Sequence, residues 1–299
     1  MFDCAKLLFL HALTSLHPGS GSEIGLVDLP VQREKHTGYP KVEASSLKGA
    51  IRSVIEAKVR DNNKIEKIFG LAGDKDKSSD THAGALSFSD ARVLLFPVRS
   101  LKGVFAWVTC PFAVNRFNHE VKAYSSIMEG NLPELPQVEP NTVSSRALVI
   151  AGGNRPISVV LDEYTFEVQE KEGTRRFAET LGNLVFPGLG SGFTDRVVVL
   201  SDDAFTDFVS LCTEVNARIR IESTKGTVED GGLWYEELVP PETVFYSFCF
   251  TGKERTATEN ALTGKEVMDF LTDSRNLPEV FQIGGDSTVG RGFVRRIWV

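Results

Sequence analysis

The spacing of apolar residues changes along the chain and predicts both strands and helices. Residues 6–13 form a nearly continuous apolar run, which is typical of a strand buried on both faces. In residues 46–60 the apolar side chains recur at helical spacing, which predicts a helix with one buried face, capped by Ser45 or Ser46. Lys48 and Arg52 fall on the opposite side of that helix and are expected to face solvent.

Shorter apolar segments predict most of the remaining elements. Strands are expected at 85–88, 92–96, 104–109, 147–151, 158–161, 164–168, 197–200, 244–250, 280–283 and 293–299. Two more helices are expected, one that begins after Ser201 and one at 259–271. This order indicates an α+β protein with helices on one face of a sheet, and an RRM-like, or ferredoxin-like, core with long insertions fits it. No linker divides the chain, so we expect residues 1–299 to form one domain.

Two polar segments interrupt this pattern. Residues 15–44 are rich in Gly and Pro and are long for a loop inside a domain, which favours a functional role. Residues 72–84 are polar and predict a mobile loop. We therefore look for chemistry first in the segment 15–44.

Composition and charge narrow the classes of protein. Hydrophobic residues make up 41% and charged residues 24%, as in ordinary soluble globular proteins. The N-terminal apolar run is too short for a membrane span or a signal peptide, so we expect a cytoplasmic protein without a membrane partner. The net charge of −7 argues against coating nucleic acid by bulk charge, but leaves room for a local basic groove. The four cysteines form no CxxC pair, so they indicate buried apolar positions and not a zinc site.

The segment that starts at His17 and runs into the helix at 46–60 combines glycines with charged side chains. Glycines let backbone amides approach an anion, and a helix N-terminus adds partial positive charge. With Lys48, this combination could hold an RNA backbone or be an ordinary glycine-rich turn. Asp28, followed closely by Arg33, could bind a divalent ion or transfer a proton, or could simply accept hydrogen bonds from backbone amides.

Two glycine-rich stretches lie nearer the C-terminus. Residues 226–237 place paired glycines beside Trp234, Tyr235 and Glu236, which could offer stacking surface and carboxylates, or form a hairpin whose aromatic rings fill the core. Residues 284–292 hold four glycines between two expected strands, with a spacing that is neither the dinucleotide-binding nor the Walker pattern. They predict either a close backbone approach to a ligand or a tight strand connection.

Together these stretches resemble the RAMP superfamily of CRISPR proteins, whose glycine-rich loop is similar to residues 284–292. Within it, the chain is most similar to the fourth subunits of type III-B Cmr complexes. The matching segments are 17–21, 27–34, 46–49, 96–103, 231–237 and 282–285. They follow one another over most of the chain, while residues 118–195 match less clearly.

The resemblance implies an RRM-like palm, a helical region and a thumb β-hairpin, which we expect within residues 143–171 around the turn at Gly152–Gly153. It implies that copies stack along a guide RNA together with other Cmr subunits and that each copy cuts the complementary target RNA. By motif position the catalytic residue is Asp28, acting with a divalent ion (Mg²⁺ or Mn²⁺), and its candidate helpers are His17, Tyr235 and Glu236. The residues expected to bind RNA are Lys48, Arg52, Arg33, Lys102, Gly284, Gly285, Gly290, Arg291 and Gly292.

Other functions stay open at this point. The chain could be an RNA-binding backbone subunit that does not cut, or a RAMP endonuclease that processes the guide precursor with a histidine and without metal. A nucleotide-binding enzyme that uses the loop at 284–292 is a further alternative. The metal dependence of cleavage and the choice of substrate separate these functions.

Overall fold

The computed structural model describes residues 2–23, 25–71, 81–128, 130, 132, 134–150, 156–256 and 261–299. The helices are α1 (Ala44–Lys58), α2 (Asn62–Phe69), α3 (Pro111–Tyr124), α4 (Glu172–Val185), α5 (Ser191–Thr194), α6 (Asp202–Leu211), α7 (Gly264–Thr272) and the 3-10 turn η1 (Ser287–Val289). The strands are β1 (Phe2–Ala12), β2 (Lys41–Val42), β3 (Gly70–Leu71), β4 (His82–Ala83), β5 (Leu86–Phe88), β6 (Ala91–Arg99), β7 (Phe105–Thr109), β8 (Thr142–Val143), β9 (Ser158–Leu161), β10 (Tyr164–Glu167), β11 (Gln169–Glu170), β12 (Val197–Val199), β13 (Glu214–Ile221), β14 (Val228–Leu238), β15 (Val244–Gly252), β16 (Val280–Gln282) and β17 (Phe293–Trp298).

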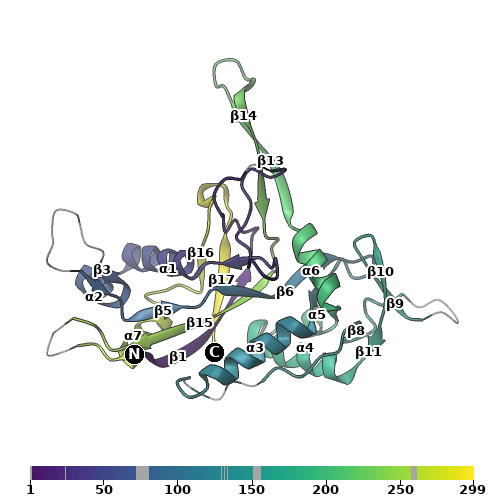
Figure 1. Cartoon of the computed structure of the whole chain (residues 1–299), viewed down its shortest axis with the longest axis horizontal. Helices are drawn as coiled ribbons and strands as arrows, with labels where there is room; N and C mark the ends of the chain where they lie inside the picture. The colour runs from purple at the N-terminus through teal and green to yellow at the C-terminus, as the bar shows by residue number, and fades with distance from the viewer. Residues whose placement is uncertain are drawn as a thin grey trace.

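One large mixed sheet organises this α+β fold (Figure 1). Its strand order is β11-β8-β12-β7-β6-β15-β1-β17-β16, with β2 paired to β6 and β5 paired to β15. Strand β1 is antiparallel to both β15 and β17, whereas β12 is parallel to β7. Residues Leu7 to Leu10 of β1 are at most 1% exposed, which confirms the prediction of a strand buried on both faces.

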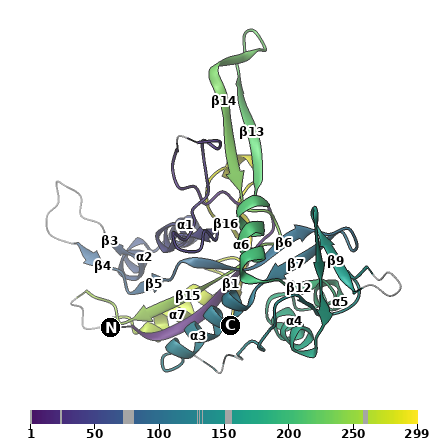
Figure 2. The same ribbon diagram turned by 45° about the vertical axis from the view of Figure 1, so that its right-hand side comes forward.

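Helices cover both faces of the sheet (Figures 1 and 2). Leu8 and Leu10 of β1 pack in one core cluster with side chains of α1, α2, α6 and α7. Leu7 and Phe9 point the other way and pack in a second cluster with α3 and α4. The prediction of helices on one face is therefore wrong. The apolar side chains on both sides of β1 require cover on both sides, and it is provided by two helices that the apolar spacing did not predict.

Local capping explains where the helices begin. Ser201 caps α6 as predicted, since its Oγ accepts a hydrogen bond from the Ala204 N–H at 3.2 Å. Helix α1, in contrast, begins at Ala44, whose N–H donates to the distant carboxylate of Asp90 at 2.9 Å. The two predicted serine caps are thus wrong, because a side chain from another part of the fold does the capping. Helix α7 begins after a capping box between Thr263 and Glu266, and not at residue 259.

A long hairpin, β13–β14, projects from the body in both views (Figures 1 and 2). The segment 143–171, where the sequence predicts the thumb, does not form this projection. Its strands β8 and β11 join the large sheet, and β9–β10 is a short hairpin in which Val159 and Leu161 are buried. The turn at Gly152–Gly153 lies outside the described residues.

Two further expectations concern the polar loop at 72–84 and membrane-spanning segments. Of the loop predicted at 72–84, residues 72–80 lie outside the described residues, while His82–Ala83 form β4 against β3. In the part of the chain that the structure describes, no helix has the length and apolar character needed to span a membrane.

Candidate functional site

The loop that follows β1 lies against the base of the β13–β14 hairpin. Leu29 makes a parallel bridge with Glu236. Its N–H donates to the Tyr235 carbonyl at 3.1 Å, and its carbonyl accepts from the Glu237 N–H at 3.0 Å. Leu29 thus extends the hairpin by one short strand-like contact at the edge of β14. This pairing holds the neighbouring Asp28 in place.

The side chain of Asp28 is exposed and fixed at one of its two oxygens. Its Oδ2 accepts a hydrogen bond from the Tyr235 N–H at 2.7 Å, and its own N–H donates to the Tyr235 carbonyl at 3.1 Å. Within the described residues no donor contacts Oδ1. The carboxylate therefore accepts a hydrogen bond from a backbone amide, which is one interpretation offered from the sequence. It also leaves one oxygen available to a ligand or a proton, as the other interpretation requires.

The side chain of Glu237, also on β14, holds the same loop. Its carboxylate is 6% exposed and accepts from the Val31 N–H at 2.9 Å, the Thr213 hydroxyl at 2.7 Å and the Arg33 guanidinium at 2.5 Å. Arg33 also donates to the carbonyls of Gly38 and Val209. The guanidinium predicted to bind RNA is thus engaged in holding the loop to the hairpin base.

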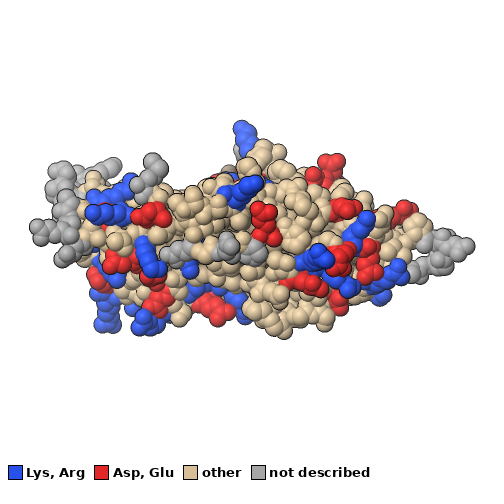
Figure 3. Space-filling model, turned by 90° about the horizontal axis from the view of Figure 1, so that it is seen from below, with Lys and Arg blue, Asp and Glu red and all other residues tan. Residues whose placement is uncertain are grey.

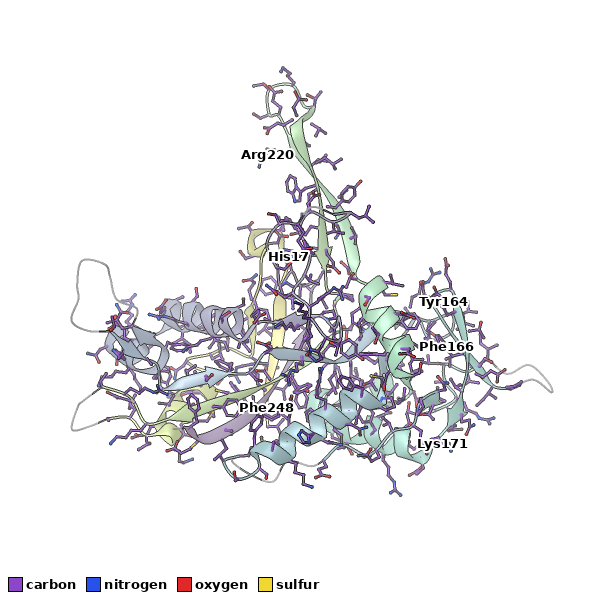
Figure 4. The ribbon with its side chains drawn as sticks, viewed as in Figure 1. His17, Tyr164, Phe166, Lys171, Arg220 and Phe248 are labelled. Atoms are coloured by element: carbon purple, nitrogen blue, oxygen red, sulfur yellow. The ribbon has the colours of Figure 1, made fainter. Side chains whose placement is uncertain are left out.

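His17 lies beneath the base of the hairpin (Figure 4) and is 8% exposed. Its Nδ1 is 2.7 Å from the Glu237 carbonyl oxygen. Because a carbonyl only accepts, Nδ1 carries the hydrogen and Nε2 is the nitrogen left for other partners. Nε2 lies 4.0 Å from Oε1 of Glu236, so the imidazole and this buried carboxyl face each other.

Arg218 joins Glu236 to the glycine-rich loop. Its Nε donates to Oε2 of Glu236 at 2.9 Å and its Nη2 donates to Oδ2 of Asp286 at 2.9 Å. Burial raises the pKa of Glu236, the hydrogen bond with Asp286 raises it further, and Arg218 opposes the change. The same hydrogen bond from Glu236 lowers the pKa of Asp286. The two carboxyls therefore influence each other's pKa in opposite directions, and Arg218 lies between them.

Sequence reasoning missed both Arg218 and Asp286. A signal for Arg218 exists, because residues 214–221 alternate strictly between polar and apolar side chains, the period of a strand. Asp286 has no comparable signal, since its role depends on a contact with a side chain 68 positions away in sequence.

The glycine-rich loop packs on the backbone of His17. The Gly285 N–H donates to the His17 carbonyl at 2.9 Å. Gly284 has a φ of +78°, and a Cβ there would collide with the same carbonyl oxygen. Gly292 has a φ of +77°, and a Cβ there would collide with the Ile283 carbonyl oxygen. A tight strand connection that positions His17 accounts for these glycines, and Arg291 adds a hydrogen bond to the Ser15 hydroxyl at 2.9 Å.

The other predicted cations contact different parts of the fold. Lys48 is half-buried and donates to the Leu86 carbonyl at 3.2 Å, and Arg52 donates to the carbonyl of Gly70 and to Glu56. Burial, together with the charge of Arg52, lowers the pKa of Lys48. The expectation that both side chains simply face solvent is wrong, because β5 and β3 pack beside this face of α1. Lys102 is exposed and donates to the Val149 carbonyl at 3.1 Å.

The face of the molecule opposite the projecting hairpin carries no patch of a single charge over the described residues (Figure 3). On this face, opposite the projecting hairpin, Lys and Arg are interspersed with Asp and Glu over the described residues (Figure 3). Within those residues, no three His, Cys, Asp or Glu side chains are grouped to hold a metal ion.

Comparison with known proteins identifies the family. The RAMP superfamily profile matches residues 9–295. The chain is 38% identical over 296 residues to the CRISPR system Cmr endoribonuclease Cmr4 of Pyrococcus furiosus, and the match covers 97% of this chain and 94% of that protein. The chain belongs to the Cmr4 family of the RAMP superfamily. This Cmr4-family chain is also 26% identical to the CMR subunit Cmr4 of Saccharolobus solfataricus, with 100% and 97% of the two chains covered.

Solved structures show the same fold. Oligomeric Cmr4 from Pyrococcus furiosus superposes with a TM-score of 0.70 at 29% identity, and the match covers 99% of this chain and 98% of that one. A chain of the type III-B Cmr-beta complex bound to cognate target RNA superposes with a TM-score of 0.76 at 25% identity, with 99% and 98% covered. The mixed α+β architecture of this Cmr4-family chain is therefore shared with proteins that form oligomers and RNA-bound complexes.

Proposed function

We propose that this Cmr4-family chain is a backbone subunit of a type III-B CRISPR effector complex, which binds guide RNA in stacked copies and cleaves the complementary target RNA. Its relative from Pyrococcus furiosus, similar over nearly the whole chain, is named an endoribonuclease. The observation that carries the proposal is the position of Asp28. Its carboxylate is fixed on the edge of β14 at the base of a projecting hairpin, where His17 and Glu236 also lie.

We propose that one antiparallel part of the sheet is an RRM-like palm within a single domain of residues 1–299. Strands β6, β15, β1 and β17 are neighbours in this order, and α1 and α7, which precede β6 and β17, pack on the same face. RRM modules stack bases on the open face of their sheet. Here α3 and α4 cover that face. RNA is therefore expected at the hairpin base, and we assign the thumb to β13–β14 in place of residues 143–171.

The chemistry follows from the RNA and from the fixed carboxylate. Target RNA carries its own nucleophile, the 2′-OH beside the scissile phosphate. Asp28 is placed to accept the proton of that hydroxyl through its unbonded Oδ1. His17 is the candidate to donate a proton to the leaving oxygen, and for this its ring must be in the imidazolium form, with Nδ1–H bonded to the Glu237 carbonyl and the second proton on Nε2. The backbone of Tyr235 meanwhile holds Asp28 in position.

A divalent ion fits this site only with help from the substrate. Mg²⁺ is often held by one or two carboxylates together with substrate phosphates, and Asp28 offers one free carboxylate oxygen. Such an ion, Mg²⁺ or Mn²⁺, would stabilise the negative charge that develops on the phosphate. We propose that cleavage of the target depends on this ion. We also propose that the protein acts in the cytoplasm.

The proposed RNA contacts outside the catalytic group are those of Lys48, Arg52 and Lys102, because Arg33 and the glycine-rich loop already hold the site together. Lys102 is exposed, and Lys48 and Arg52 are partly exposed, so each can reach a phosphate once its hydrogen bond to a carbonyl is broken, and Arg52 must also leave Glu56. Sequence specificity would come from base pairing with the guide, while protein groups contact the backbone.

The test uses the complex assembled on a guide RNA. Labelled complementary RNA should be cut at regular intervals in Mg²⁺, remain intact in EDTA, and be cut slowly by the His17→Ala complex. A complex that binds the target but leaves it whole in Mg²⁺ would identify a non-catalytic subunit. Cleavage of the target that is unchanged in EDTA would exclude the metal, and cleavage only of guide precursor would exclude the target as substrate.

A further inference from the structure

A cavity of about 260 Å³ opens between helix α6 and the short β9–β10 hairpin, away from the Asp28 site. Its wall is aromatic: the rings of Tyr164 and Phe166 lie 6.0 and 5.9 Å from the ring of Phe208. Tyr164, at the outer end, is 57% exposed, and Leu211 beside it is 72% exposed. Figure 4 shows Tyr164 and Phe166 on the strand that faces α6.

The rim of this cavity carries only negative charge. The ionisable groups that line it, besides Tyr164, are the carboxylates of Asp162, Glu163 and Asp207 and the thiol of Cys212. All three carboxylates are exposed, and no Lys or Arg among the described residues lies within ion-pair distance of them. A cavity with aromatic walls and an acidic rim favours a cation on an apolar stem, because the ring faces and the carboxylates both attract positive charge.

We propose that this cavity binds the Arg220 side chain of a neighbouring copy of the chain in the stack. The inference rests on the proposed function in one respect, the stacking of copies, which is supported by the similarity to oligomeric Cmr4. It adds a specific contact to that stack.

Arg220 suits this role by position and by charge. It lies on the projecting hairpin away from the body of its own copy (Figure 4). Its side chain is 69% exposed, and its carboxylate neighbour on the hairpin, Glu229, is 3.7 Å away. A guanidinium with a long methylene stem stacks well on aromatic rings.

The spacing along the chain keeps Arg220 away from the cavity of its own copy. Helix α6, one wall of the cavity, ends at Leu211, and β13 begins at Glu214. Arg220 lies six residues farther along this strand, or roughly 20 Å at the rise of a β-strand. This distance exceeds the length of an Arg side chain, so Arg220 can enter only the cavity of a different copy. A head-to-tail contact of this kind repeats without closing, as a stack requires.

Cys212 provides a readout at the cavity that does not depend on RNA cleavage. Burial, together with the charge of Asp162, raises the pKa of the Cys212 thiol, so labelling with N-ethylmaleimide is run above neutral pH. Peptide mass spectrometry follows Cys212 in the free chain and in the complex assembled on guide RNA. In the assembled complex we expect labelling of Cys212 to slow at least tenfold in all copies that have a neighbour on this side.

Charge reversal tests the partner. Arg220→Asp and Asp207→Arg should each restore fast labelling of Cys212 and weaken assembly roughly tenfold, and the double variant should restore protection. Asp203→Arg, on the same helix but outside the cavity, is the matched control and should leave Cys212 protected.

The outcomes separate this proposal from the proposed function. If the chain assembles and cuts target RNA but Cys212 labels at the same rate as in the free chain, the cavity is empty and the proposal is wrong. Protection that persists in the Arg220→Asp complex would show another occupant and would also overturn it. If the unaltered chain does not assemble on RNA, the proposed function fails together with this contact.

Discussion

Replacement of Glu237 by Gln tests whether the Asp28 loop is held by a buried carboxylate. In the structure one oxygen accepts from the Val31 N–H, and the other accepts from the Thr213 hydroxyl and the Arg33 guanidinium. A glutamine amide has nearly the same shape but only one accepting oxygen. Whichever way it turns, its NH₂ group faces at least one buried donor.

The expected cost follows from the number of interactions lost. Hydrogen bonds to charged groups contribute about 1.5–3 kcal/mol each, and the substituted glutamine would lose one or two of them together with the ion pair to Arg33. We therefore expect the free energy of unfolding to fall by roughly 2–4 kcal/mol. For a chain of this size, this corresponds to a decrease in Tm of roughly 4–8 °C.

The adjacent residue supplies the matched control. Glu236 is equally buried, but among the described residues its carboxylate accepts from one donor, Arg218, and a glutamine oxygen can keep that bond, so Glu236→Gln should cost less than Glu237→Gln. Differential scanning calorimetry and urea unfolding of the two variants give the comparison. If Glu237→Gln melts within about 1–2 °C of the unaltered chain, or if the Glu236 variant is the less stable, the reasoning about this anchor is refuted.

Three further predictions follow from other contacts. Burial and the Asp286 carboxylate both raise the pKa of Glu236, so Asp286→Asn should lower this pKa in an NMR titration. The stability that the raised pKa contributes at low pH, and that is lost as the pH rises through the folded-state pKa, should then be lost at lower pH, and an unchanged pKa would contradict the coupling of the two carboxyls. Gly284→Ala places a methyl group against the His17 carbonyl and should lower the free energy of unfolding in urea by at least about 2 kcal/mol. Gly290→Ala, in open space at a φ of +80°, should lower it by about 1 kcal/mol, and the reverse order would refute the packing role of Gly284. Lys48→Ala with Arg52→Ala should weaken guide-RNA binding and reduce the slope of log affinity against log salt by roughly 1.4, and an unaltered slope would exclude both phosphate contacts.

Strands of the fold could largely be predicted from the sequence, because their apolar runs are short and sharply bounded. The segment expected at 158–161 is β9, and the run expected at 6–13 covers the second half of β1 and one residue beyond its end. Strand β13 was missed although residues 214–221 alternate in character, whereas a hairpin was one of the two interpretations of residues 226–237, which contain most of β14. Helices α3 and α4 were missed in regions of mixed character that the apolar spacing did not resolve.

The site could be predicted in part. His17, Asp28 and Glu236 were named on motifs, and the structure brings them to one place through contacts such as that between Asp28 and Tyr235, 207 positions apart. The different roles of the two neighbouring carboxylates could not be predicted. Glu236 faces His17 and Glu237 anchors the loop because strand alternation points them to opposite sides of the hairpin, and which side holds which partner is decided by tertiary packing.

The central claim is that Asp28 carries out the cleavage of target RNA. Asp28→Asn keeps the shape of the side chain and one oxygen that can accept from the Tyr235 N–H, so assembly and RNA binding should not change. The decisive measurement is the single-turnover rate of cleavage of labelled target RNA by complexes in which every copy carries Asp28→Asn, with binding measured in the same preparation. We predict target binding within about twofold of the unaltered complex and a loss of cleavage of at least about 100-fold at every position. Cleavage at the normal rate by fully assembled Asp28→Asn complexes would contradict the account.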